Sequence, residues 1–75
     1  MINKIFKPNW LPNRNGYKFM ALIEENDGHF WEPAEIKINE KTGLHYVSGL
    51  HKPIEYKKIV GWLRVDEKGN AIQIG

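Results

Sequence analysis

Apolar side chains occupy most positions between Tyr17 and Glu24, and they divide into two sets under the two-residue period of a β-strand. One set is Tyr17, Phe19, Ala21 and Ile23, and the other is Met20 and Leu22. Because both faces of this segment are apolar, we predict a strand in the interior of a sheet.

The segment after the Asn26-Asp27-Gly28 turn shows a cleaner alternation. Apolar residues at 34, 36 and 38 alternate with charged residues at 35 and 37, as in a strand with one buried face. Pro33 cannot donate a hydrogen bond to a neighbouring strand, which predicts a bulge or a free edge between Trp31 and Pro33.

Two further strands are predicted at residues 44–48 and 59–65, and turn residues rich in Asn, Asp and Gly separate the predicted strands. Residues 71–74 are a candidate to pair back across the turn at 66–70. The segment 49–58 is either a loop or a single helical turn opened by Pro53.

These elements predict a mainly β fold, with little or no helix, in one small domain over residues 1–75. We expect an extended N-terminal arm at 1–12 and an antiparallel sheet of four to five strands within 17–74, arranged as a meander or as an SH3-like barrel. The second face of the sheet needs a cover, which the arm, a curl of the sheet or a partner could supply.

The composition narrows the class of protein. The chain has 75 residues, no Cys and a net charge of +2, so neither a disulfide framework nor a thiolate zinc site supports the fold. Its first eight residues are too short and polar for the core of a signal peptide, and no apolar run reaches the ~20 residues of a membrane span. We therefore expect a soluble cytoplasmic protein that does not bind membranes.

Residues that could support catalysis are few. His29, His45 and His51 have no metal-ligand spacing, and Ser48, the only serine, lies in a predicted turn without a base. The acidic pairs are explained by solvated turns and outward strand faces. We expect no enzyme activity, no catalytic residue, no metal and no cofactor.

A neighbourhood of basic and aromatic residues suggests one kind of binding. Its members are Lys52, Tyr56, Lys57, Lys58 and Arg64. Lysines can contact phosphates and tyrosines can stack on bases, so nucleic-acid binding is one hypothesis.

Large aromatic residues suggest a second kind of binding, to another protein. A small sheet has few means of burying every tryptophan, and exposed aromatic residues often anchor protein interfaces. Trp10, Trp31 and Tyr46 are therefore the predicted protein-binding residues. The favoured hypothesis is a protein-binding module whose partner is another protein or a second copy of the chain.

The chain also resembles a small uncharacterised domain family of phages and prophages. The shared features are Trp10-Leu11-Pro12, the strand 17–24, Phe30-Trp31 and the closing strand 59–63, although Arg64-Val65-Asp66 replaces that family's proline-containing tail. The resemblance implies a phage or prophage origin and a phage or host-bacterium protein as the partner, with inhibition by occlusion as one outcome.

A second resemblance, to SH3-like barrels of Tudor type, depends on the strand from Trp31 to Ile36. Such barrels can hold methylated basic side chains in an aromatic cage. This chain has no clear set of cage aromatics, so the likeness applies only to the fold.

Overall fold

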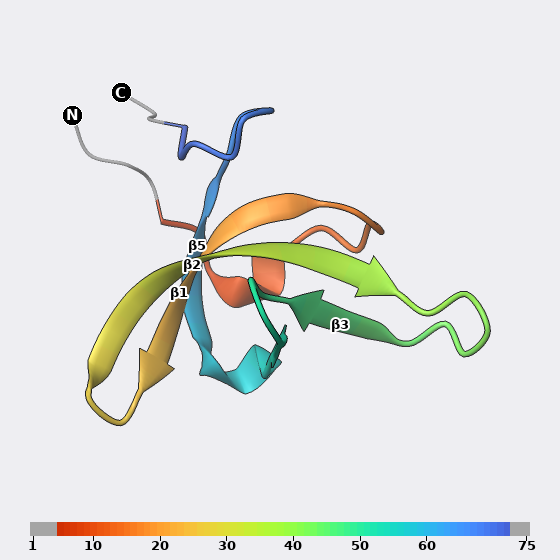
Figure 1. Ribbon diagram of the computed structural model, residues 1–75, viewed down its shortest axis with the longest axis horizontal. Coiled ribbons are helices and arrows are strands. Elements are labelled where there is room, and N and C mark those ends of the chain that lie inside the picture. Colours follow the sequence, from red (N-terminus) through yellow and green to blue (C-terminus); the bar gives the residue numbers. More distant parts are fainter. Residues whose placement is uncertain (1–4, 73–75) are drawn as a thin grey trace.

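The computed structural model describes residues 5–72, which form one antiparallel sheet of five strands in the order β4-β3-β2-β1-β5 (Figure 1). The strands are β1 (Lys18–Glu25), β2 (Gly28–Ile38), β3 (His45–Ser48), β4 (Pro53–Ile54) and β5 (Ile59–Arg64). The first four form a meander, and β5 returns to pair with the free side of β1. The mainly β, antiparallel fold class predicted from the alternation is confirmed.

β1 lies in the interior of the sheet, because β2 pairs with one of its edges and β5 with the other. Phe19, Ala21 and Ile23 are buried on the inner face of β1. Met20 and Leu22 are half-buried on the opposite, outer face. The prediction of a central strand with two apolar faces is therefore confirmed.

β2 contains Pro33 without any break in its pairing with β1, where Pro33 lies opposite Met20. β3 pairs with residues 35–38 only, so no strand of the described chain lies on the other side of Pro33. The Ile36 amide points toward β1 and donates to the Tyr17 carbonyl at 2.8 Å. Since backbone groups alternate along a strand, the nitrogen of Pro33 faces the open side. The free edge predicted here is confirmed, and the bulge is not needed.

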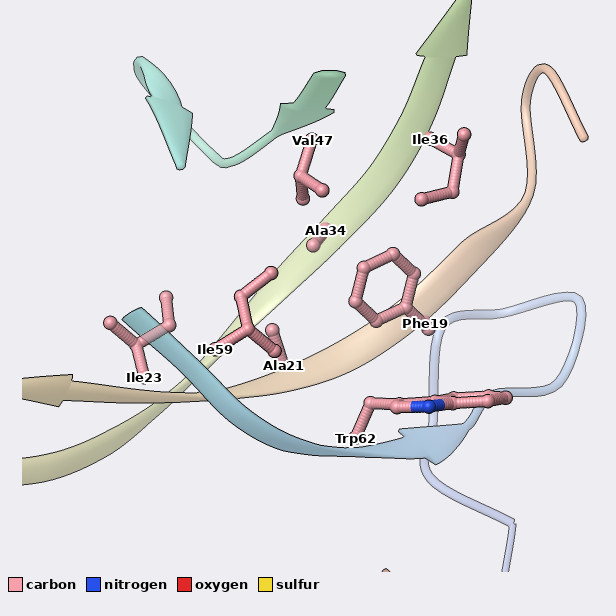
Figure 2. Packing of buried hydrophobic residues seen from close by; sticks show 8 residues of the cluster. All are labelled: Phe19, Ala21, Ile23, Ala34, Ile36, Val47, Ile59 and Trp62. Atoms are coloured by element: carbon pink, nitrogen blue, oxygen red, sulfur yellow. The ribbon is translucent and has the colours of Figure 1, made fainter. Parts of the chain in front are cut away.

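The hydrophobic core lies on the inner face, where side chains from four strands meet (Figure 2). Its buried members are Phe19, Ala21, Ile23, Ala34, Ile36, Val47, Ile59 and Trp62. Val47 on β3 and Trp62 on β5 belong to the same cluster, although a flat sheet would hold these two strands about 14 Å apart. The sheet must therefore curl around its core.

Trp62 makes contacts on several sides in this core. Its ring stacks on Phe6 with centroids 4.7 Å apart, and it meets Phe19 and Tyr17 edge-on at 5.9 Å each. Its indole N–H donates to the Lys7 carbonyl at 2.9 Å. The largest side chain of the core thereby holds the N-terminal arm.

The arm follows the second edge of β5. Phe6 and Trp62 exchange two backbone hydrogen bonds of 2.8 and 3.0 Å. The chain then forms a 3-10 turn, η1 (Pro8–Trp10), so the arm is not extended over the whole of 1–12 as predicted. Proline suits the first helical position because its φ is already fixed and its missing N–H would be unpaired there. Residues 1–4 lie outside the described chain.

The segment left open at 49–58 contains both a strand and a helical turn. β4 pairs with Val47 and Ser48, and η2 (Tyr56–Lys58) is a 3-10 turn that begins after Glu55. The turn therefore does not open at Pro53, because Pro53 is already held opposite Ser48. Within residues 5–72 the helical elements are too short for a membrane-spanning helix.

The predicted return of the chain after the last strand is present as a single bridge. Val65 pairs with Ala71, and the Ile72 amide donates to the Arg64 carbonyl at 2.8 Å. Residues 73 and 74 of the predicted segment lie outside the described chain.

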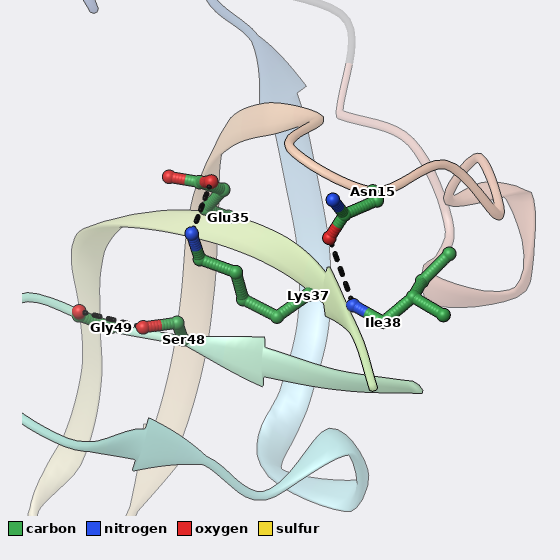
Figure 3. A network of polar contacts seen from close by, with 6 residues as sticks. All are labelled: Asn15, Glu35, Lys37, Ile38, Ser48 and Gly49. Atoms are coloured by element: carbon green, nitrogen blue, oxygen red, sulfur yellow. Dashed lines mark hydrogen bonds and ion pairs between the residues drawn. The ribbon is translucent and has the colours of Figure 1, made fainter. Parts of the chain in front are cut away.

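Polar contacts hold the far end of β2 (Figure 3). Lys37 contacts Glu35 at 2.9 Å, and the hydrogen bond to this carboxylate raises the pKa of Lys37 above its usual value. A raised pKa in the folded state favours folding below the usual lysine pKa, so the contribution is present at neutral pH and is lost as the pH rises through the raised pKa. The pair is partly exposed to solvent, and we expect its contribution to be small.

We expect Asn15→Ala to lower the free energy of unfolding by about 1 kcal/mol. The side-chain Oδ1 of Asn15 accepts a hydrogen bond from the Ile38 amide at 3.0 Å, and the substitution removes this acceptor. Urea denaturation followed by circular dichroism measures this change. The control is Asn13→Ala in the same loop. Equal stability of the two variants would contradict a structural role for this hydrogen bond.

Candidate functional site

The three predicted protein-binding residues are exposed, but they lie on different parts of the molecule. Trp10 on η1 is 68% exposed, Trp31 on β2 is 42% exposed and Tyr46 on β3 is 47% exposed. Trp31 lies on the outer face opposite Leu22, far along β2 from the residues that pair with β3. The structure therefore does not combine the three into one surface.

The predicted nucleic-acid residues are also divided. Lys57 contacts Glu55 at 3.5 Å, and Lys58 contacts Glu25 at 3.3 Å. Arg64 lies at the opposite end of β5 from η2, with its guanidinium 5.5 Å from the centre of the Phe6 ring. Neighbouring carboxylates thus offset two of the four positive charges in the predicted phosphate-binding set.

Lys52 also has acidic neighbours. It lines a hollow of about 190 Å³ together with Glu25, Glu32, Glu55 and Lys58. The hollow therefore contains three carboxylates and two ammonium groups. This mixture gives no concentrated positive field of the kind that nucleic acids require.

A groove of about 450 Å³ lies between the arm and β3. We call it the arm groove, and its lining residues are Pro8, Asn9, Leu11, Pro12, Asn13, Ile36, His45, Tyr46, Val47, Ile54 and Tyr56. None of these eleven is Asp, Glu, Lys or Arg, whereas 27% of the whole chain is charged. The groove is therefore an uncharged strip on a charged molecule.

The groove is built on the hydrophobic core. Ile36 and Val47 are buried core residues, and Leu11 and Ile54 pack against the same cluster. On one side, the contact between Trp62 and the Lys7 carbonyl positions the start of η1, and the Leu11 amide donates to the Pro8 carbonyl at 3.1 Å. The arm wall of the groove is thus connected to the core rather than free in solvent.

The opposite side of the groove includes Tyr56, which begins η2 and is 52% exposed. Tyr46 of β3 also borders the groove, but it lies opposite Lys37, so its side chain is on the outer face of the sheet, away from the buried Ile36 and Val47. Tyrosine combines a large apolar ring with a polar hydroxyl group, which suits the wet rim of a binding site. Tyr46 belongs to the predicted protein-binding set and Tyr56 to the predicted nucleic-acid set, and the structure brings these two residues to one groove.

Sequence reasoning did not identify the remaining groove residues as a site. The sequence indicated that the arm could cover the second face of the sheet. This expectation was the available signal for the arm side of the groove. The partners across the groove are 23 to 48 positions later in the sequence, and no local pattern connects them.

His29 and His45, which could support metal or acid–base chemistry, lie in different parts of the molecule. His29 contacts Glu24 at 3.1 Å across the β1–β2 hairpin, whereas His45 lines the arm groove. Among residues 5–72, no three His, Asp or Glu side chains are grouped so that they could hold a metal ion.

Comparisons with protein-family models, with curated proteins and with solved structures gave no match. The resemblance to a phage domain family stays a prediction from the sequence.

Proposed function

We propose that this chain is a non-catalytic protein-binding module and that the arm groove is its binding site. The supporting observation is the uncharged lining of a groove that has an apolar floor and the half-exposed Tyr56 on its rim. Protein interfaces are depleted in charged residues at their centre and enriched in aromatic residues. The energy of binding is usually concentrated in a few such aromatic side chains.

Nucleic-acid binding is the less favoured function. A phosphate backbone needs several free Lys or Arg side chains on one face. Here Lys57 and Lys58 contact carboxylates, and Arg64 lies at the other end of β5. The proposed partner is therefore a protein, which the sequence resemblance suggests is a phage or host-bacterium protein in the cytoplasm.

A random peptide library displayed on phage particles, selected on the immobilised protein, tests the proposal. We expect enrichment of peptides rich in uncharged apolar residues, because the groove offers no charge to pair with. Tyr56→Ala should weaken an enriched peptide by roughly 30-fold, as for a hot-spot aromatic residue. Isothermal titration calorimetry measures the affinities, and Trp31→Ala, which alters an exposed aromatic residue on the outer face, is the matched control.

Two results would contradict this function. One is a selection that enriches no peptide, or a selection whose peptides bind the Tyr56→Ala variant with the same affinity as the original chain. The other is salt-sensitive binding of short DNA that disappears when Lys52, Lys57 and Lys58 are replaced with Ala.

A further inference from the structure

The direction of the backbone groups in β2 determines which amides and carbonyls of β3 form hydrogen bonds with β2. The amides of Ile36 and Ile38 point toward β1, since they donate to the Tyr17 carbonyl at 2.8 Å and to the Asn15 side chain at 3.0 Å. The Asn39 amide points the other way and donates to the Leu44 carbonyl at 2.8 Å. The odd-numbered residues of β2 therefore provide its hydrogen bonds to β3.

This alternation continues into β3. Tyr46 lies opposite Lys37, so its amide and carbonyl face β2. The amides and carbonyls of His45 and Val47 face the opposite side. Val47 is paired there with Ile54 of β4, and the Gly49 amide donates to the Lys52 carbonyl in the same hairpin.

β4 is too short to cover the whole of β3. It consists of Pro53–Ile54, and the chain then leaves the sheet to form η2. Figure 1 shows the short segment that contains β4 beside the arrowhead of β3, and this segment does not reach the start of β3. In the described chain, therefore, no strand lies beside the amide and carbonyl of His45.

This open stretch of backbone borders the arm groove. His45, Tyr46 and Val47 form one side of the groove, and the arm forms the other with Pro8 and Pro12, which have no N–H to donate. The arm is thus poorly suited to complete the hydrogen bonds of β3. An open strand edge beside an apolar groove is a template for an added strand.

We propose that an extended segment of a partner protein adds to the sheet beside His45 and places an uncharged apolar side chain over Ile36, Val47 and Ile54. This inference depends on the proposed function and specifies its mode. A helical segment already satisfies its own backbone groups, so it would leave those of His45 unpaired. The uncharged lining excludes acidic or basic side chains from the position over the floor.

The test uses a peptide enriched in the selection described above. Successive residues of the peptide are N-methylated one at a time, and hydrogen exchange of the protein amides is followed by NMR with and without peptide. We expect a loss of roughly tenfold or more at the one peptide residue whose N–H binds the His45 carbonyl, and small losses at its neighbours, because in β3 only His45 has backbone groups with no strand beside them. We also expect slower exchange at His45, while Tyr46, whose amide already faces β2, serves as the internal reference.

The outcomes of this test distinguish the proposed mode of binding, strand addition, from the proposed function, protein binding at the arm groove. Peptides that bind through Tyr56 without slowing exchange at His45, or without one N–H whose methylation strongly weakens binding, would overturn strand addition and leave the binding function intact. A selection that enriches no peptide would refute both. Slow exchange at His45 in the protein alone, together with a dimeric mass in light scattering, would place a second copy at this edge and overturn the partner assignment.

Discussion

Replacing Trp62 with alanine is expected to lower the free energy of unfolding by about 3–5 kcal/mol. Trp62 is 2% exposed, stacks on Phe6 and contacts both Phe19 and Tyr17 at its edges. The substitution also removes the N–H that binds the Lys7 carbonyl. Small domains have total stabilities of about 5–15 kcal/mol, so this loss removes a large fraction of the free energy of unfolding.

Urea denaturation followed by far-ultraviolet circular dichroism measures this change. Trp10→Ala is the matched control, because Trp10 is 68% exposed and its replacement should change stability by less than about 1 kcal/mol. Trp62→Phe should fall between the two, since it keeps an aromatic ring but loses the indole N–H. Similar unfolding midpoints for Trp62→Ala and Trp10→Ala would contradict the structure of the core.

Phe19→Ala is expected to have a comparable effect, also about 3–5 kcal/mol. Phe19 is 1% exposed in the middle of the core and has the largest fully buried side chain among the described residues. Its neighbours belong to a continuous cluster built on four strands, which cannot collapse around a cavity without moving the backbone.

Phe30→Ala provides the comparison for Phe19→Ala. Both residues lie on the inner face, but Phe30 is near the end of the β1–β2 hairpin and is 42% exposed. We expect its replacement to cost about 1 kcal/mol, since only part of the ring leaves an apolar environment. If the midpoints in thermal or urea unfolding had the reverse order, the assignment of the core would be wrong.

The strands could be predicted from the sequence because their signal is local. Alternation between Tyr17 and Glu24, and again between Ala34 and Ile38, determines which side chains share a face before any pairing is known. Pro33 indicated a free edge for an equally local reason, its missing N–H.

The order of the strands and the helical turns could not be predicted in the same way. β5 returns to β1, a contact that joins residues 19 and 64, and no periodicity in either segment specifies that partner. The segment 49–58 was predicted to be either a loop or a single helical turn opened by Pro53. Pro53 instead pairs with Ser48, and the helical turn begins at Tyr56.

The candidate site was harder still to predict. Size and hydrophobicity identified the tryptophans as interface residues, but these properties do not distinguish Trp62, which is in the core, from Trp10, which is on the surface. Tyr46 and Tyr56 were assigned to different functions because Tyr56 lies among basic residues in the sequence and Tyr46 does not. Only the curl of the sheet and the path of the arm bring both to the same groove.

The contact between the arm and Trp62 has a consequence for how the molecule assembles. The indole N–H and the carbonyl that it binds are 55 positions apart, so closing this loop carries a large entropic cost that later contacts must offset. The β1–β2–β3 hairpins involve short loops and should form early in folding, whereas β5 and the arm dock afterwards. During synthesis on the ribosome, Trp62 emerges well after the arm that it holds, so the apolar residues of the arm are open to chaperones in the interval.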